Sequence, residues 1–427
     1  MPSRPPLSAL LLLVAALATP AFAPAAAGGP SEPERHEYVV VLSPGTEDVD
    51  AVAAELLAPW GATPGFVYTH ALAGFSVHLD AAGAAELAAA RGVELVERSR
   101  LFAPASAAVP VPTGLSRIGG ARLAGTATRV NVDVAVLDTG VDADHPDLRV
   151  HHRVDCTRPV TVTSRPLIPF VTTSSSRERE VCAPDRGDDD SGHGTHVAGV
   201  IGARDDGHGV VGVAPGARIW SVKVLDVEHG GGSTGQVVAG IDHATERASQ
   251  LEVVNLSFVA HGRSRATDRA IAGARRAGLV VVAAAGNDAA PASSYSPANA
   301  PGVITVSAIT DLDGAPGGSA AGSCRGGDDQ FATYSNYGPA VTIAAPGSCV
   351  VSTAVGGGTA SYSGTSVAAP HVAGAAARHI ARTREPRRAA RWERTRDALL
   401  AAAAPQDGPC GFTGGRSAEP LLRLTGC

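Results

Sequence analysis

Short apolar runs recur along the middle of the chain and are separated by polar and glycine-rich segments. Near-continuous runs of valine, isoleucine, leucine and alanine occupy 130–137, 251–258, 278–285 and 302–308. Runs of this length are typical of parallel strands that are buried on both faces, with helical segments between them. The pattern therefore predicts an α/β domain with a central parallel sheet and helices on both faces.

The region from about 28 to 106 has a different pattern. Two strand-like segments, Tyr38–Leu42 and Ala73–Leu79, alternate with helical stretches near 49–58 and 81–91 that are rich in alanine, leucine and glutamate. We expect these segments to form a separate small α+β unit. The Ala/Pro-rich linker LFAPASAAVPVP follows the last of them.

The first residues have the organisation of a secretory signal peptide. Arg4 precedes an apolar run from Leu7 to Ala18, which is shorter than the roughly 20 residues that a membrane-spanning helix needs. Small residues then offer cleavage sites, of which the one near Ala27 is favoured because Pro24 follows the earlier one. A membrane anchor is the alternative reading. Since no later segment is long and apolar enough to span a bilayer, we expect a secreted, extracellular protein.

Composition and charge narrow the classes of function. The 427 residues are 44% hydrophobic, which is enough for a large core. Because the formal net charge is −6, we expect no nucleic-acid partner. The acidity is local: residues 28–106 hold 4 basic and 11 acidic side chains, whereas the residues after 106 hold 30 of each.

Six cysteines in an exported chain usually pair, although six allow 15 connectivities. The spacing favours three local pairs, of which the first would close a long polar loop. The pairs are Cys156 with Cys182, Cys324 with Cys349, and Cys410 with Cys427.

Two segments place a carboxylate and an imidazole where chemistry can occur. RVNVDVAVLDTGV is an apolar strand that ends at Asp138, and parallel strands put their reactive edge at the carboxyl end. In DDDSGHGTHVAGVIG, glycines flank His193 and a helix follows. The alternatives are a turn aspartate, a bystander histidine, or a zinc site with His196, which lacks the glutamate of the H-E-x-x-H motif.

Two further segments place a hydroxyl and an amide in similar positions. Ser366 precedes an Ala/Val-rich helix, whose first N–H groups and positive dipole end favour a developing oxyanion. Asn287 ends the buried strand GLVVVAAAGND, and its amide can donate to the same oxygen. A helix cap and a turn residue are the alternatives.

The order of these residues makes the combined signal specific. Asp138, His193 and Ser366 follow one another at intervals of 55 and 173 residues, which is the chain order of subtilisins. Over roughly 107–380 the chain resembles the subtilisin family of serine proteases, motif by motif. The segments that carry the resemblance are VAVLDTGVDADHPDL, GHGTHVAGVIG, VVNLSF, AAAGN and GTSVAAPHVAG.

The resemblance implies a subtilisin-like three-layer fold and a set of roles. Asp138, His193 and Ser366 would form the catalytic triad. Asn287 and the Ser366 N–H would form the oxyanion hole, and His196 would be a structural neighbour. These roles imply a secreted, monomeric serine endopeptidase that cleaves proteins or peptides through an acyl-enzyme and needs no cofactor for catalysis. A catalytically silent binding protein of the same fold and a peptide ligase are the alternatives.

The N-terminal region is similar to the inhibitor-type propeptide of the family, through HEYVVVL, ALAGFSVHL and GVELVERSR. Its junction resembles that of the proteinase K branch, which implies self-cleavage near Ser106. The expected organisation is a signal peptide (1–27), a propeptide that inhibits its own chain (28–106), a catalytic domain (107–404) and a cysteine-containing tail (405–427).

The resemblance also indicates where a substrate binds. Relatives usually have Leu-Gly-Gly after the serine of the substrate strand, whereas this chain has Phe258-Val259-Ala260. The β-branched Val259 would narrow the primary pocket or shift the bound peptide, and we expect a small apolar side chain before the cut. The candidate substrate-binding residues are Ser257, Phe258, Val259, Ala283, Ala284, Ala285 and Gly286.

Two departures from the family concern oxidation and calcium. Val367 stands where relatives usually have a methionine that is readily oxidised, so we expect resistance to peroxide. Thr342 stands where the proteinase K branch has a carboxylate ligand, so calcium dependence is not inherited. Oxygen-rich loops can still bind calcium, although charge runs are more often solvated loops. The candidates are Asp185, Asp188, Asp189 and Asp190.

An arginine-rich stretch lies near the end of the chain. Eight arginines occur from Arg378 to Arg396, against Glu385 and Glu393. We expect the solvated face of closing helices here. The alternative is a surface that binds an anionic partner.

Overall fold

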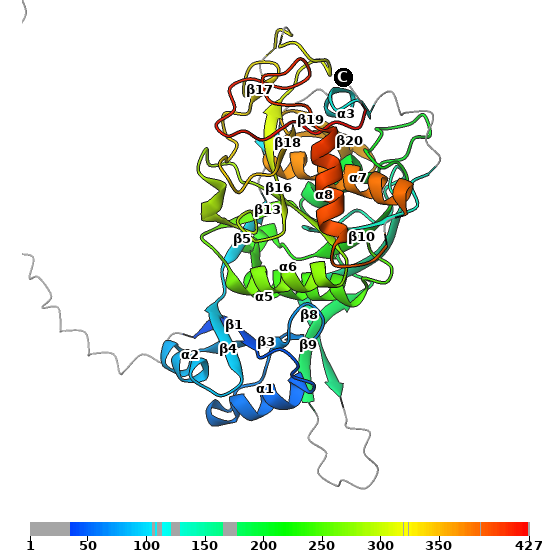
Figure 1. The fold of residues 1–427 in the computed structure, drawn as a ribbon. Coiled ribbons are helices and arrows are strands. Elements are labelled where there is room, and N and C mark those ends of the chain that lie inside the picture. The colour runs from blue at the N-terminus through cyan, green and yellow to red at the C-terminus, as the bar shows by residue number, and fades with distance from the viewer. Residues whose placement is uncertain are drawn as a thin grey trace, which may run out of the picture. The chain divides into compact units, whose positions relative to one another are not determined.

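A nine-stranded sheet lies at the centre of the larger part of the chain, which follows residue 112 (Figure 1). Neighbouring strands run parallel in the order β18, β16, β14, β12, β7, β10, β8, while β17 and β9 pair antiparallel with β16 and β8. The strands are β7 (Asp133–Asp138), β8 (Val150–Ser164), β9 (Arg177–Pro184), β10 (Arg218–Lys223), β12 (Val253–Leu256), β14 (Val280–Ala284), β16 (Ile304–Thr310), β17 (Gln330–Phe331) and β18 (Ile343–Pro346). The four apolar runs correspond to β7, β12, β14 and β16.

The computed structural model describes residues 35–104, 107–108, 113–120, 129–164, 177–318, 320–322, 324–384 and 386–425. All of these fall in one unit of the chain. The signal peptide predicted at 1–27 and the cleavage point predicted near Ser106 lie outside the described residues.

Successive residues of β7 face two different helix layers. Val134 and Val136 pack into a core with α4, α7 and α8, whereas Ala135 and Leu137 pack into a core with α5 and α6. Both faces of the strand are covered, in keeping with its apolar residues from Val134 to Leu137, and the predicted α/β class is confirmed. The helices are α4 (His193–Gly202), α5 (Thr234–Glu246), α6 (Arg265–Arg276), α7 (Thr365–Thr383) and α8 (Arg391–Ala402).

Strand β7 is the point where the sheet changes its direction of growth. The chain adds β8 and β10 on one side of β7 and then β12, β14, β16 and β18 on the other. Open α/β sheets bind ligands beyond the carboxyl ends of the strands at such a switch point. Asp138 is the last residue of β7 and therefore lies at this edge.

The N-terminal unit, residues 35–104, carries a four-stranded antiparallel sheet in the order β2, β3, β1, β4. One face packs on α1 and α2 through Val40, Leu42 and Phe75, as expected for a small α+β unit. The elements are β1 (His36–Leu42), α1 (Val49–Leu57), β2 (Val67–Tyr68), β3 (Gly74–Leu79), α2 (Ala81–Ala88) and β4 (Val93–Arg98).

Two small sheets connect the N-terminal unit to the rest of the chain. Strand β5 lies between β11 and β13, with β15 beyond β13, and β6 pairs with β20 beside β19. The elements are β5 (Leu101–Pro104), β6 (Ala107–Ala108), α3 (Gly114–Arg117), β11 (Gly232–Ser233), β13 (Phe258–His261), β15 (Tyr295–Ser296), β19 (Val350–Ala354) and β20 (Gly358–Ser363).

The polar loop predicted between Cys156 and Cys182 is largely a β-hairpin. Strands β8 and β9 pair antiparallel from Val154↔Pro184 to Ser164↔Arg177, with an irregularity after Asp155. Backbone pairing satisfies this polar segment because β8 also pairs with β10 of the central sheet, a long-range contact that local composition does not show. The Cys156–Cys182 and Cys324–Cys349 disulfides are confirmed. The third predicted pair includes Cys427, which lies outside the described residues.

The arginine-rich stretch is only partly a solvated surface. Arg382, Arg384 and Arg388 are exposed, as expected. Arg391 is 1% exposed, and its Nη1 donates to the Gly278 carbonyl at 3.2 Å. That side chain therefore joins α8 to the loop before β14. In the part of the chain that the structure describes, no helix combines the length and apolarity that a bilayer crossing requires.

Candidate active site

An aspartate and a histidine meet at the carboxyl edge of the central sheet. His193 is the first residue of α4, and its Nδ1 lies 2.6 Å from Asp138 Oδ1 at the end of β7. Burial opposes a charge on the imidazole, but the charge of Asp138 and the hydrogen bond to it outweigh burial and raise the pKa of His193. The other ring nitrogen, Nε2, is buried without a hydrogen-bond partner among the described residues. His193 can therefore accept a proton at Nε2 while Asp138 holds Nδ1.

Asp189 joins the strand that carries the aspartate to the helix that carries the histidine. Its Oδ1 accepts from Thr139 Oγ1 at 2.8 Å and from the Gly192 N–H at 2.8 Å. Its Oδ2 accepts from the N–H and Oγ1 of Thr195, at 2.8 and 2.6 Å. Thr139 and Gly192 adjoin Asp138 and His193, so this buried carboxylate positions both. Sequence analysis assigned Asp189 only to a calcium site and missed this role.

Ser366 lies in the first turn of α7, next to a bonded Thr–Asn pair. The N–H and Oγ1 of Thr365 both donate to Asn287 Oδ1, each at 2.9 Å. Thr365 Oγ1 in turn accepts from the Gly286 N–H at 2.9 Å. Because the amide oxygen of Asn287 accepts both hydrogen bonds from Thr365, the amide nitrogen points away from Thr365. The helix start and the β14 loop are thereby locked together beside Ser366.

The end of β12 also reaches Ser366. Ser257 Oγ donates to the Ser366 carbonyl at 2.7 Å and accepts from Asn255 Nδ2 at 2.8 Å. All three side chains are buried. Four elements, β7, α4, β12 and α7, therefore bring the three predicted triad residues to one edge of the sheet.

His196 has a structural environment. Its Nε2 donates to the Val350 carbonyl at 2.9 Å, and its ring stacks on Tyr362 with centroids 4.5 Å apart. Burial lowers the pKa of His196 to about 3, which keeps the ring neutral. Neither His193 nor His196 belongs to a group of three metal-binding side chains within the described residues.

Strand β5 of the same chain lies between β11 and β13, next to these residues. Strand β5 pairs antiparallel with β11 on one side and with Phe258 and Val259 of β13 on the other. Phe102 of β5 is fully buried, with its ring centroid 5.4 Å from that of Phe258 in an edge arrangement. Of the other predicted substrate residues, Ala283 and Ala284 belong to the two core layers, and Ala285, which follows β14, belongs to a third apolar cluster.

The four aspartates predicted as calcium ligands bind separate partners. Asp188 pairs with Arg153, and Asp190 pairs with the Nζ of Lys223, both at 2.8 Å. Asp189 is saturated by the contacts given above. Asp185 is an exposed residue with φ +56° and contributes to no group of three close ligands in the described ranges. Thr342 Oγ1 accepts from the Thr305 N–H at 3.2 Å.

Another acidic group offers oxygen ligands. Side-chain oxygens of Asp311, Asp313 and Asp328 lie within 4.8 Å of one another. Burial raises the pKa of Asp311 to about 7, although Thr113 and Arg117 oppose that rise. Carboxylates suit a hard cation such as calcium, but both oxygens of Asp328 already accept backbone N–H groups. The spacing Asp-Leu-Asp-Gly was the sequence signal that could have found this group.

Known proteins resemble this chain in sequence and in fold. It is 35% identical over 271 residues to subtilisin amylosacchariticus of Bacillus subtilis subsp. amylosacchariticus, across 62% of this chain and 60% of that protein. It is 33% identical over 352 residues to an extracellular serine proteinase of Thermus sp. (strain Rt41A), across 79% of this chain and 74% of that one. The chain thus spans about 60% of the length of the first of these relatives.

The crystal structure of fervidolysin from Fervidobacterium pennivorans, described as a keratinolytic enzyme related to subtilisin, has the same fold. It matches 93% of this chain and 61% of its own, with a TM-score of 0.69 at 24% identity. The model of the subtilase family matches residues 130–417, which is more than half of the chain and includes Asp138, His193, Asn287 and Ser366. The chain therefore belongs to the subtilase family.

Proposed function

We propose that this chain is a secreted serine endopeptidase, made as a zymogen that cuts itself between the N-terminal unit and the subtilase part. The observation that carries the proposal is β5, an extended peptide held between β11 and β13, and β13 directly follows Ser257, which contacts Ser366. The space between β11 and β13 would then be the substrate groove. Binding of a backbone as an added strand is a general way to present a peptide. The two disulfides and the extracellular relative favour secretion.

In the proposed mechanism, Ser366 Oγ attacks the carbonyl carbon of the scissile peptide while His193 Nε2 takes its proton. Asp138 holds the imidazole through Nδ1 and stabilises the imidazolium that forms, as the raised pKa of His193 supports. The C–N bond then breaks as His193 returns the proton to the leaving amine. Water attacks the acyl-enzyme by the same route and releases the acid. These steps use side chains of the protein alone.

The negative oxygen of the tetrahedral intermediate would be stabilised by two donors. One is the amide nitrogen of Asn287, whose oxygen is anchored by Thr365. The other is the backbone N–H of Ser366 in the first turn of α7, where the helix dipole adds to the effect. Loss of such an asparagine costs about 10²–10³ in rate, a value established on subtilisin itself.

The N-terminal unit is the proposed propeptide. Asp242 of α5 accepts three of its backbone N–H groups, from Thr69, His70 and Ala71, at 3.3, 2.8 and 2.6 Å. Glu97 of the unit accepts the first N–H groups of α6, from Arg265 at 2.6 Å and Ala266 at 3.0 Å. These charged hydrogen bonds support a unit that covers α5 and α6 and keeps β5 in the groove.

The chain on both sides of the predicted junction is held by the subtilase part. Strand β5 ends at Pro104, and β6 begins at Ala107, where it pairs with β20, the strand before α7. The predicted cut near Ser106 falls between these two strands. This arrangement supports self-cleavage, because the strands on both sides of the predicted cut are extended.

The substrate preference follows from β13. Val259 pairs with Ala103 of β5, so its backbone contacts a bound peptide and its β-branched side chain leaves less room than glycine. We propose that small apolar side chains are preferred before the cut.

The test is digestion of a peptide library by the purified protein, with and without a fluorophosphonate that labels reactive serines. We expect cleavage that stops when Ser366 is labelled, and a mass spectrum that assigns the label to that residue. Cleavage that persists after complete labelling would contradict the proposal. A silent binding protein would neither label nor cleave, and a ligase would join an added amine to the acyl group in preference to water.

A further inference from the structure

We propose that the arm formed by β8 and β9 is a second binding site for the N-terminal unit, which delays the departure of that unit after the chain is cut. This inference rests on the proposed function. Figure 1 shows β8 and β9 extending from the central sheet to run alongside the N-terminal unit. None of the triad residues belongs to the arm.

The arm extends the sheet of the N-terminal unit at its open edge. Strand β2 is the edge strand of that sheet, and the residues just before it, Gly65 and Phe66, face β9. The Glu180 N–H donates to the Gly65 carbonyl at 2.9 Å, and Phe66 forms a parallel bridge with Glu180. An exposed edge is a ready site for an added strand, and the arm supplies one.

Gly65 allows this approach because it has no side chain. A Cβ at this position would lie 2.7 Å from Ser76 Oγ and 3.2 Å from Glu180 Oε2. The nearer atom belongs to Ser76 of the unit itself, whose Oγ accepts from the Phe66 N–H at 2.9 Å, so a larger residue would displace that hydroxyl next to the residue that forms the bridge to β9. The position is therefore suited to a close pairing between the unit and the arm.

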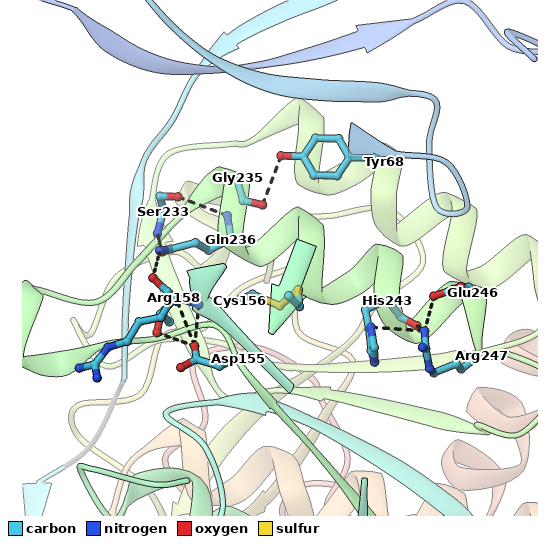
Figure 2. Close-up of a disulfide and its surroundings, with 12 residues drawn as sticks. Tyr68, Asp155, Cys156, Arg158, Ser233, Gly235, Gln236, His243, Glu246 and Arg247 are labelled. Carbon is cyan, nitrogen blue, oxygen red and sulfur yellow. Dashed lines mark hydrogen bonds and ion pairs between the residues drawn. A yellow bond between two sulfur atoms is a disulfide. The ribbon is translucent and has the colours of Figure 1, made fainter. Parts of the chain in front are cut away.

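The disulfide of the arm belongs to the apolar core that the two parts share. Cys156 is fully buried, in the same cluster as Val39, Phe66 and Tyr68 of the N-terminal unit, and Cys182 packs against that cluster. Figure 2 shows the Cys156 disulfide beside α5, the helix whose Gly235 carbonyl accepts from the Tyr68 hydroxyl at 3.3 Å. The arm thus adds apolar area as well as a hydrogen bond to the contact.

The base of the arm is connected to the groove through the start of α5. Asp155 Oδ1 accepts from the N–H and Oγ1 of Thr157, at 2.8 and 2.6 Å, where the pairing of β8 with β9 is irregular between Asp155 and Val160. Gln236 Nε2 donates to the Thr157 carbonyl at 3.5 Å. The same Gln236 caps α5 together with Ser233, and Ser233 pairs with Leu101 of β5. One helix turn therefore contacts both the arm and the strand in the groove.

The hydrogen bond to Gly65 can be removed without breaking the arm. The Glu180 N–H donates to Gly65 rather than to β8, although Glu180 lies opposite Thr161 in the β8–β9 ladder. A proline at position 180 would remove that donor and leave the donors of its neighbours in place. Glu180→Ala is the matched control, because it removes the carboxylate and keeps the N–H.

The first experiment follows two events in full-length protein. Mass spectrometry measures when the chain is cut, and hydrolysis of a short peptide measures when the groove becomes free. We expect the delay between the two events to shorten about 3- to 10-fold in Glu180→Pro relative to Glu180→Ala, the scale of one hydrogen bond. Equal delays in the two variants would overturn the proposal.

A second measurement does not depend on cutting. In the Ser366→Ala background, which should stay intact, hydrogen exchange reports how firmly the N-terminal unit is held. Glu180→Pro should speed exchange at β2 and β3, and Glu180→Ala should not. Should the unaltered chain fail to cut itself, the proposed function fails and exchange alone decides on the arm. Equal exchange in both variants would then overturn it.

A third variant guards against misfolding of the proline variant. The double substitution Cys156→Ala and Cys182→Ala opens the arm and keeps small apolar side chains in the shared core. It should shorten the delay and speed exchange in the same assays. Unaltered behaviour in that variant would count against the arm as strongly as equal values in the first pair.

Discussion

The N-terminal unit and the subtilase part bury their sheets in different ways. Helices of the subtilase part cover both faces of the central sheet. The N-terminal sheet has its own helices on one face only, and Val39 and Val41 on the other face join the core of α5 and α6. A unit of this size has a small core of its own, so it depends on the subtilase part to bury the second face of its sheet. Loss of the small part would therefore leave helices on both faces of the central sheet, but it would expose the apolar side of α5 and α6 that packs on Val39 and Val41.

The largest expected effect comes from keeping the two parts joined. Ser366→Ala removes the proposed nucleophile, so the unprocessed chain should accumulate and peptidase activity should fall by about 10⁶-fold, a scale established on subtilisin itself. Gel mobility and a fluorogenic peptide measure the two outcomes. Normal maturation of this variant in a host without proteases would contradict the assignment.

The next effect comes from weakening the contact between the parts. Asp242→Ala removes the acceptor of three N–H groups of the N-terminal unit, which leaves them unpaired in a partly buried site. Hydrogen bonds to charged groups contribute about 1.5–3 kcal/mol, so the cut unit should leave about 10- to 100-fold faster. Asp397→Ala, on the surface of α8, is the control. Unchanged retention in Asp242→Ala would show that the shared core alone holds the unit.

A smaller effect is expected from pH. Burial and the charge of Glu37 raise the pKa of Glu180, against the effect of His78, while the hydrogen bond to Asp242 raises the pKa of His70. Both groups therefore bind protons more tightly in the joined state. The contribution of each group to retention of the N-terminal unit is complete below its ordinary pKa. This contribution is lost as pH rises through the raised pKa.

Retention of the N-terminal unit should accordingly weaken a few-fold as pH rises, first above the ordinary glutamate range and then above the ordinary histidine range. Glu180→Gln should abolish the first change and His70→Gln the second. The measurement is the delay between cutting and activity across pH. Retention that strengthens with pH would contradict both assignments.

The smallest expected effect is that of peroxide on activity, because neither the N-terminal unit nor the subtilase part contains a methionine. Met1 is the only methionine, and Val367 is buried beside Val200 and Val350, next to Ser366. Activity should persist in dilute peroxide. Val367→Met should become sensitive, since a sulfoxide is polar and would enter an apolar cluster. Rapid inactivation of the unaltered chain with intact disulfides would be the opposite result.

Elements whose residues are apolar on both faces could be predicted from the sequence. Strand β7 could be predicted because two helix layers bury its apolar residues Val134, Ala135, Val136 and Leu137. The same holds for β14. The candidate site was found for a related reason. Asp138, His193 and Ser366 each follow a strand end or begin a helix, so local pattern and chain order both point to one edge.

Elements that depend on distant partners could not be predicted. Strand β9 is polar, and it forms because β8 pairs with it. Strand β8 is itself anchored by β10, which lies far from β8 along the chain. Asp189 resembles its acidic neighbours in sequence, and only folding shows that Thr139 and Thr195 surround it. Arg391 is one of eight arginines and is buried because the loop before β14 offers it a carbonyl.

Under the proposed function, strand β5 has a consequence for which proteins can be cleaved. Leu101 and Phe102 pair with β11, and Ala103 and Pro104 pair with β13, so a peptide that takes the place of β5 must be extended over all four residues. A segment inside a helix or a sheet has its own backbone hydrogen bonds and cannot adopt this pairing until they open. Cuts in folded proteins should therefore map their flexible loops, and the rate at which a target is destroyed should report its local unfolding rather than its amino-acid sequence.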